Sequence, residues 1–143
     1  MQDFNTNLDK IIILRIKTNI IGLGKIGKDY DKSHKYNIGN YVTSVLQDHR
    51  LQLISLLDIS TLKFDKKIRK IKNINLFTSI HKMMANTNPD LVIVSSSTSS
   101  QYMIMKKILK YEPRYIILEK PACQNEKELK NIINQKKKIK NLC

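Results

Sequence analysis

The residues with the clearest chemical meaning in this sequence are three glycines at a fixed spacing. They lie in the segment G-L-G-K-I-G at residues 22–27, directly after the apolar pair Ile20-Ile21. In a strand–turn–helix unit the first glycine permits a tight turn, the second lets a pyrophosphate approach the backbone, and the third lets the helix pack close to the strand. N–H groups at the start of that helix then face the phosphates. The segment therefore predicts a dinucleotide site that uses Gly22, Gly24, Lys25, Ile26 and Gly27.

A carboxylate follows residues 51–57, which form the second predicted strand. An acid at this place in a dinucleotide-binding fold accepts hydrogen bonds from the adenosine ribose, and we assign that role to Asp58. Asp58 lies 31 positions after Gly27, and the polar insertion at residues 28–38 explains why the spacing exceeds the usual value of about 20. The alternative interpretation is that Asp58 only caps the turn at Ser60-Thr61.

The charge of Asp58 also bears on the choice of cofactor. An acid at the ribose favours NAD over NADP, because it repels the 2′-phosphate that NADP carries. Lys63 lies nearby in the sequence and weakens this argument. We therefore expect NAD as the cofactor and keep NADP as a possibility.

A run of hydroxyl side chains, residues 95–100, follows the predicted strand at residues 91–94. Ligands of open α/β sheets bind outside the carboxyl ends of the strands. The hydroxyls of this run can therefore bond a nicotinamide ribose or phosphate, and the candidates are Ser95, Ser96 and Ser97. The alternative interpretation is a helix cap at Ser99 or Ser100.

The segment Glu119-Lys120-Pro121 follows the predicted strand at residues 115–118 and is expected at the same edge of the sheet. A lysine beside the cofactor can bond a substrate hydroxyl and manage its proton during hydride transfer, which makes Lys120 the candidate catalytic residue. The neighbouring Glu119 can hold the lysine ammonium in place. Taken alone, the three residues are better explained as a surface turn in which the proline ends the strand.

Periodicity places these segments in an alternating order of strands and helices. Further strands are predicted at residues 16–21 and 74–77, and helices at 40–48, after Ser79, up to about residue 111, and after Asn125 with Leu129, Ile132 and Ile133 facing inward. This order predicts a single α/β domain with a Rossmann-like, doubly wound parallel sheet over residues 16–143. Residues 1–15 are expected to form a tail or an extra strand.

The formal net charge of +14 is compatible with a partner that is a polyanion. However, lysine supplies 22 of the 26 basic residues and is spread along the chain, whereas specific readers of bases and phosphates favour arginine. We therefore do not expect nucleic acid as a partner. Two cysteines 20 positions apart indicate neither a metal site nor a disulfide framework, and a cytoplasmic protein is expected. No apolar run reaches the length of a membrane span.

Taken together, three segments of this sequence resemble the Gfo/Idh/MocA family of oxidoreductases. They are Gly22 to Gly27, Pro89 to Val94, and Leu118-Glu119-Lys120-Pro121 followed by an acid-capped helix. The resemblance runs from about Lys17 to the C-terminus. It implies an NAD(P)-dependent enzyme that acts on sugars, cyclitols or related alcohols, with Lys120 in contact with substrate.

The chain also departs from the pattern of that family. A proline and a histidine that many members carry after the fourth strand are absent from residues 96–101, and the insertion after Gly27 resembles that of one subgroup. The resemblance further implies a second, substrate-binding domain that this sequence does not contain.

We therefore expect a Rossmann domain that binds a nicotinamide dinucleotide without full catalysis. A sugar-like substrate becomes relevant only if a second domain is supplied, through a homo-oligomer or a partner chain. The alternative is a non-catalytic regulatory or polyanion-binding module that retains the Rossmann fold.

Overall fold

The computed structural model describes residues 14–24 and 40–140, with side chains as far as Lys136. Its centre is a five-stranded sheet in the order β3-β2-β1-β4-β5, in which every neighbouring pair is parallel. The strands are β1 (Ile16–Ile21), β2 (Leu51–Leu57), β3 (Asn75–Phe77), β4 (Leu91–Val94) and β5 (Tyr115–Leu118). The Rossmann-like α/β fold predicted from the sequence is confirmed.

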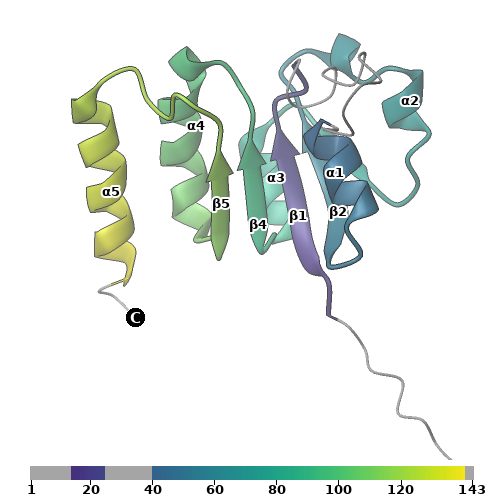
Figure 1. Cartoon of the computed structure of the whole chain (residues 1–143), viewed down its shortest axis with the longest axis horizontal. Coiled ribbons are helices and arrows are strands. Elements are labelled where there is room, and N and C mark those ends of the chain that lie inside the picture. Colours follow the sequence, from purple (N-terminus) through teal and green to yellow (C-terminus); the bar gives the residue numbers. More distant parts are fainter. Residues whose placement is uncertain (1–13, 25–39, 141–143) are drawn as a thin grey trace, which may run out of the picture.

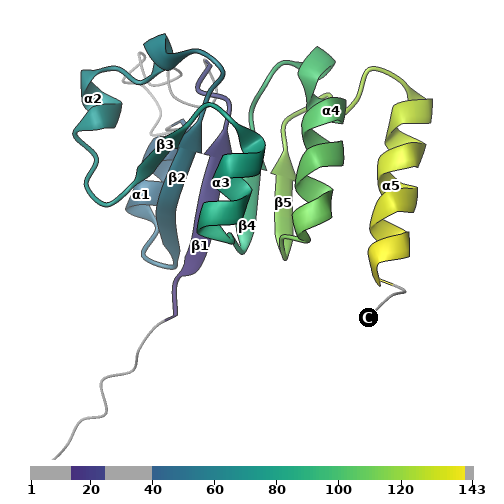
Figure 2. The same ribbon diagram turned by 180° about the vertical axis from the view of Figure 1, so that it is seen from behind.

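Helices cover the two faces of the sheet. They are α1 (Tyr41–Gln47), α2 (Lys66–Arg69), α3 (Ile80–Thr87), α4 (Thr98–Ile108) and α5 (Glu126–Lys140). Figure 1 shows α1 on the near face of the sheet, and Figure 2 shows α3 and α4 on the opposite face, with α5 beyond α4. Within the described residues, no helix is long and apolar enough to cross a membrane.

The order of the strands creates a switch point between β1 and β4. The chain moves outward from β1 through β2 to β3, then returns to place β4 and β5 on the other side of β1. Because all five strands are parallel, their carboxyl ends meet at one edge of the sheet. Loops that leave β1 and β4 diverge there, and such a point is where open α/β sheets bind ligands.

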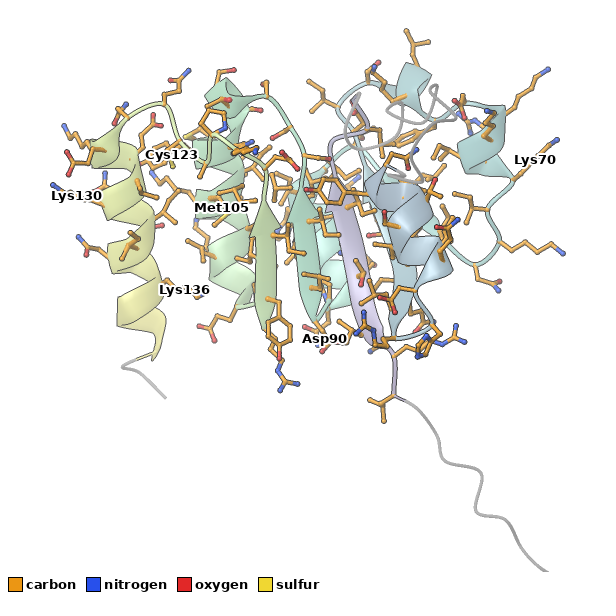
Figure 3. The ribbon with its side chains drawn as sticks, in the orientation of Figure 1. Lys70, Asp90, Met105, Cys123, Lys130 and Lys136 are labelled. Carbon is orange, nitrogen blue, oxygen red and sulfur yellow. The ribbon has the colours of Figure 1, made fainter. Side chains whose placement is uncertain are left out.

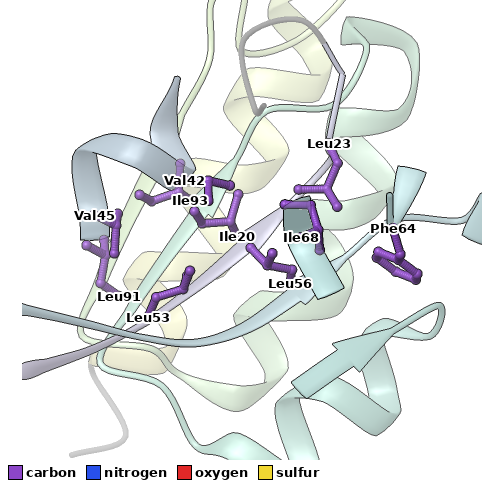
Figure 4. Packing of buried hydrophobic residues seen from close by; sticks show 10 residues of the cluster. All are labelled: Ile20, Leu23, Val42, Val45, Leu53, Leu56, Phe64, Ile68, Leu91 and Ile93. Carbon is purple, nitrogen blue, oxygen red and sulfur yellow. The ribbon is translucent and has the colours of Figure 1, made fainter. Parts of the chain in front are cut away.

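Two buried clusters hold the layers together, one on each face. Figure 4 shows the first, in which Val42 and Val45 of α1 pack against Ile20, Leu53 and Ile93 of the strands. The second lies under α3 and α4, and its fully buried members include Ile21, Val92, Met83 and Ile108. Since neighbouring side chains of a strand point to opposite faces, the continuous apolar run of β4 supplies both clusters, as expected of a central parallel strand.

The amino edge of the sheet is fixed by one acidic residue. The Asp90 carboxylate accepts a hydrogen bond of 2.9 Å from the Lys17 N–H, and the Asp90 N–H donates to the Lys17 carbonyl at 3.0 Å. The Asp90 carbonyl accepts a further bond of 2.8 Å from the Tyr115 N–H. Asp90 therefore sets the starts of β1, β4 and β5 at the end of the sheet opposite the switch point, as Figure 3 shows.

Some features differ from the prediction. The basic stretch after Lys63 contains the short helix α2, which begins because the Asp65 side chain accepts from the N–H groups of Lys67 and Ile68. Among the described side chains of α5 only Ile132 is buried, while Leu129 and Ile133 remain 41% and 44% exposed, because the helix packs beside α4 and not over the sheet. The Asn125 cap of α5 is confirmed, with its side chain accepting from the Glu128 N–H at 3.0 Å.

The two-sided core leads to a stability prediction. Leu56 is fully buried in the first cluster, so replacing Leu56 with Ala should lower the free energy of unfolding by about 2–5 kcal/mol. Leu62 is 89% exposed, and Leu62→Ala serves as the matched control, with an expected change within about 0.5 kcal/mol. Urea unfolding followed by circular dichroism measures both, and equal losses would contradict the described core.

Candidate functional site

Gly22 directly follows β1 and is the first residue of the candidate site. Its φ is +93°, in the left-handed region that favours glycine, and its N–H donates to the Leu57 carbonyl at 2.8 Å. A Cβ at this position would lie 2.8 Å from the backbone atoms of Ser95 and Ser96, where no carbon atom fits. The exit of β1 is therefore packed directly against the exits of β2 and β4.

Asp58 connects the glycine segment to the exit of β2. One carboxylate oxygen, Oδ2, accepts a hydrogen bond of 2.8 Å from the Leu23 N–H, and the other, Oδ1, accepts one of 2.9 Å from the Ser60 N–H. The turn cap considered in the sequence analysis is thus present, together with a bond to the glycine segment that no spacing indicated. Each carboxylate oxygen keeps a second lone pair. The ribose role of Asp58 stays a prediction.

The hydroxyl run after β4 divides into residues with different surroundings. Ser95 is buried, and its hydroxyl donates to the Gly22 carbonyl at 2.7 Å, so it secures the glycine segment. The buried Ser96 hydroxyl has no hydrogen-bond partner among the described residues. Ser97 is the residue at the N-cap of α4, so the expected cap at Ser99 or Ser100 is wrong.

A cavity of about 780 Å³ opens beside these exits on the α3 and α4 face. Gly22, Gly24 and Asp58 line one end, and the walls come from the start of α3 and the length of α4. The charged side chains of its lining are Asp58, Lys63, Lys107 and Lys110. Three lysines against one carboxylate give the cavity a positive potential that suits an anionic ligand.

The predicted Glu119-Lys120-Pro121 segment lies at the same edge, on the β5 side of the switch point. The Glu119 N–H donates to the Val94 carbonyl at 3.0 Å, which continues the β4–β5 ladder by one bond. Lys120 is exposed, and the Lys120–Pro121 peptide bond is cis. Lys120 and the cavity residues are thus brought to one edge of the sheet by different strands.

Sequence reasoning missed one residue of this edge, Tyr41. The Tyr41 hydroxyl donates a hydrogen bond to Oε1 of Glu119, and Oε2 of Glu119 accepts from the Lys120 backbone N–H at 3.3 Å. Burial, the hydrogen bond and the Glu119 charge together raise the pKa of Tyr41 to about 12. Glu119 was expected to hold the Lys120 ammonium, but its carboxylate is bonded to these two other groups. The 78 positions between Tyr41 and Glu119 left no local signal.

Part of the predicted site lies outside the described residues. Lys25, Ile26 and Gly27 belong to the undescribed segment, as does the insertion at residues 28–38. The remaining predicted residues, which are Gly22, Gly24, Asp58, Ser95, Ser96, Ser97, Glu119 and Lys120, all lie at the carboxyl ends of β1, β2, β4 and β5. Among the described side chains, no group of three His, Cys, Asp or Glu residues is placed to hold a metal ion.

The sequence of this chain matches the model of one known protein family. The family model named Gfo/Idh/MocA, an oxidoreductase family with an NAD-binding Rossmann fold, matches residues 16–143. The chain belongs to this family. It corresponds to the NAD-binding Rossmann domain of the Gfo/Idh/MocA oxidoreductases, as the resemblance noted in the sequence implied. Comparison with curated proteins gave no match.

Solved structures share the fold of this Gfo/Idh/MocA domain at low sequence identity. The WlbA dehydrogenase from Bordetella pertussis, in complex with NADH and UDP-GlcNAcA, aligns with a TM-score of 0.71 and 17% identity over 87% of this chain and 32% of its own. The MviM dehydrogenase from Clostridium difficile aligns with a TM-score of 0.69 and 22% identity, over 87% and 37% of the two chains. For myo-inositol 2-dehydrogenase from Lactobacillus plantarum the TM-score is 0.67 and the identity 14%, over 87% and 34%. The chain therefore spans about a third of the length of these proteins.

Substitution by alanine is expected to affect stability differently at the two described glycines. Gly22→Ala should lower the free energy of unfolding by at least about 2 kcal/mol, because it combines a left-handed backbone with overlap against Ser95. A Cβ on Gly24 meets no described atom within 4 Å, so Gly24→Ala should leave stability within about 0.5 kcal/mol of wild type. Thermal and urea unfolding compare the two variants, and a Gly22→Ala protein as stable as wild type would refute the close packing.

Proposed function

We propose that this chain binds NAD across the switch point, as the dinucleotide-binding domain of an oxidoreductase that acts on a sugar or cyclitol hydroxyl. The single observation that carries the proposal is the junction at Gly22, where the glycine segment is fixed between the exits of β2 and β4 beside a positively charged cavity. A pyrophosphate belongs above such a segment, since the missing side chains let it reach the backbone N–H groups.

The residues present fit the cofactor in three respects. A Cβ on Gly24 would meet no described atom within 4 Å, which leaves room for a phosphate close to the backbone. Asp58 lines the cavity and keeps acceptor capacity for ribose hydroxyls beyond its bonds to Leu23 and Ser60. The Ser96 hydroxyl at the lining lacks a partner among the described residues. NAD so held supplies a hydride acceptor.

The position of Asp58 supports NAD over NADP. Its two oxygens are fixed by the backbone N–H groups of Leu23 and Ser60, so the carboxylate cannot turn away from an incoming 2′-phosphate without losing both bonds. Lys63 also lines the cavity and offsets part of that repulsion. We expect a preference for NAD that is moderate in size.

The role proposed for Lys120 is to bond the substrate hydroxyl and take up or release its proton. Lys120 is exposed after the end of β5, and a further domain would be needed beside it to complete a substrate site. The similar structures are about three times as long as this chain, so we propose turnover only where a further domain joins it. For this chain alone we expect binding without catalysis.

One observation favours the alternative of a polyanion-binding module. The basic residues in and after α2 are all exposed, namely Lys66, Lys67, Arg69, Lys70 and Lys72. Binding through such a surface would weaken steeply with salt and would be indifferent to NAD. NAD binding that changes little between low and high salt would favour the oxidoreductase domain.

Calorimetric titration of the purified chain with NAD tests the proposed function. We expect wild type to bind NAD more tightly than NADP. Asp58→Ala should weaken NAD binding about 10- to 100-fold, because it removes a charged acceptor from the ribose and releases the Leu23 N–H.

Asp48→Ala is the matched control for the loss of a carboxylate. Asp48 pairs with Arg50 at the surface, outside the cavity, so Asp48→Ala should leave NAD affinity unchanged. Absence of NAD and NADP binding at millimolar concentration would refute the function, and unchanged affinity in Asp58→Ala would refute the ribose contact.

A further inference from the structure

We propose that Tyr41 is a positioning residue for the nicotinamide half of the site, whose hydroxyl holds the Glu119 carboxylate and thereby leaves the Lys120 ammonium to the ligand. The proposal rests on the function proposed above and adds to it a residue that belongs to no recognised motif. Three observations carry it: the place of the hydrogen bond at the switch point, its chemistry, and the surroundings of Lys120.

The Tyr41–Glu119 hydrogen bond spans the switch point. Tyr41 is the first residue of α1, which follows β1, and Glu119 directly follows β5. In the sheet order, β4 lies between β1 and β5, so the bond links elements on the two sides of the place where the loops diverge. Tyr41 also packs against the core cluster on the α1 face, whereas the cavity opens on the α3 and α4 face.

The position of Asp58 decides which half of a dinucleotide this bond serves. Asp58 follows β2 and is the carboxylate proposed for the adenosine ribose, so the adenosine half belongs on the β2 and β3 side of the cavity, which also extends along α4. A dinucleotide whose pyrophosphate crosses at Gly22 must then extend its other half toward β4 and β5. Glu119 and Lys120 lie at that end, and Tyr41 is the residue that reaches them from across the switch point.

The Tyr41–Glu119 hydrogen bond is expected to persist across the physiological pH range. With its pKa raised to about 12, Tyr41 keeps its proton throughout the physiological range and remains a donor to the carboxylate. A hydrogen bond to an ionised acceptor is stronger than one between neutral groups. The second Glu119 oxygen is bonded to the Lys120 backbone N–H, so the whole carboxylate has a defined orientation.

This arrangement leaves the Lys120 ammonium available to bind a ligand. Glu119 and Lys120 are sequence neighbours of opposite charge, and a mobile Glu119 side chain would be free to neutralise the lysine. Within the described part of the chain, the Lys120 ammonium forms no ion pair with a carboxylate, and the Glu119 carboxylate is directed to the Tyr41 hydroxyl and the Lys120 backbone N–H. An ammonium that is not neutralised can bond the nicotinamide ribose or a substrate hydroxyl.

The test compares NAD with ADP, which lacks the nicotinamide and its ribose and shares the adenosine diphosphate half of the molecule. Calorimetry on the whole chain gives both affinities for wild type, Tyr41→Phe, Glu119→Ala and the double variant. We expect Tyr41→Phe to weaken NAD binding about threefold to tenfold, the range for one hydrogen bond, and to change ADP binding less than twofold. In the Glu119→Ala background, Tyr41→Phe should cause no further loss.

Tyr115→Phe is the matched control, since it removes a tyrosine hydroxyl at the opposite end of β5 and should change neither affinity. Wild type that binds neither ligand would refute the proposed function and this inference with it. Wild type that binds NAD and ADP equally, or a Tyr41→Phe variant that keeps the wild-type preference for NAD, would overturn the inference and leave the function standing. Equal weakening of both ligands in Tyr41→Phe, with a lowered melting temperature, would also overturn it, because it would show a purely structural contact.

Discussion

The close contact between Gly22 and the backbone after β4 is the constraint on which the rest of this molecule depends. Without a side chain, Gly22 allows β1 to end within van der Waals contact of Ser95 and Ser96, in a backbone conformation that other residues rarely adopt. The Ser95 hydroxyl then bonds the Gly22 carbonyl, and the Asp58 carboxylate bonds the next N–H, that of Leu23. These contacts within the protein hold the carboxyl ends of β1, β2 and β4 together.

This junction divides the carboxyl edge of the sheet into two regions with different chemistry. On the α3 and α4 face lies a cavity lined by lysines and one carboxylate, and after β5 lies the Glu119-Lys120 segment, which Tyr41 contacts from the α1 face. The division follows from topology, since strands β2 and β4 flank β1 and lead to opposite ends of the sheet. The two halves of an asymmetric ligand such as a dinucleotide would therefore meet different groups along this edge.

Local patterns in the sequence predicted the strands and most of the helices well. The runs at residues 91–94 and 115–118 were predicted with their observed limits, because apolar runs with clear turn residues on each side leave little ambiguity. Helix α2 was missed because its four residues hold a single buried apolar side chain, Ile68, which is too few for a period to show. The face of α5 was misjudged because its pattern cannot reveal that α4, and not the sheet, is its neighbour.

The candidate site was predictable to the extent that its residues follow strands. Parallel topology brings every strand exit to one edge, so Gly22, Asp58, Ser96 and Lys120 could be grouped from sequence alone. Hydrogen-bond partners could not, because a polar side chain at an edge has several donors and acceptors within reach. Spacing suggested that Asp58 caps Ser60 or meets a ribose, yet it also bonds Leu23.

The roles of the two fixed carboxylates follow from their surroundings. Asp58 and Glu119 are both held by two donors, but the donors of Asp58 are backbone N–H groups, whereas one donor of Glu119 is the Tyr41 side chain. A backbone donor is kept in every substitution except one to proline, so the orientation of Asp58 is a property of the fold. The orientation of Glu119 depends on one side chain from another element and can change without altering the sheet. Sequence variation should therefore be tolerated more readily around Glu119, at the proposed nicotinamide end of the site, than around Asp58, at the proposed adenosine end.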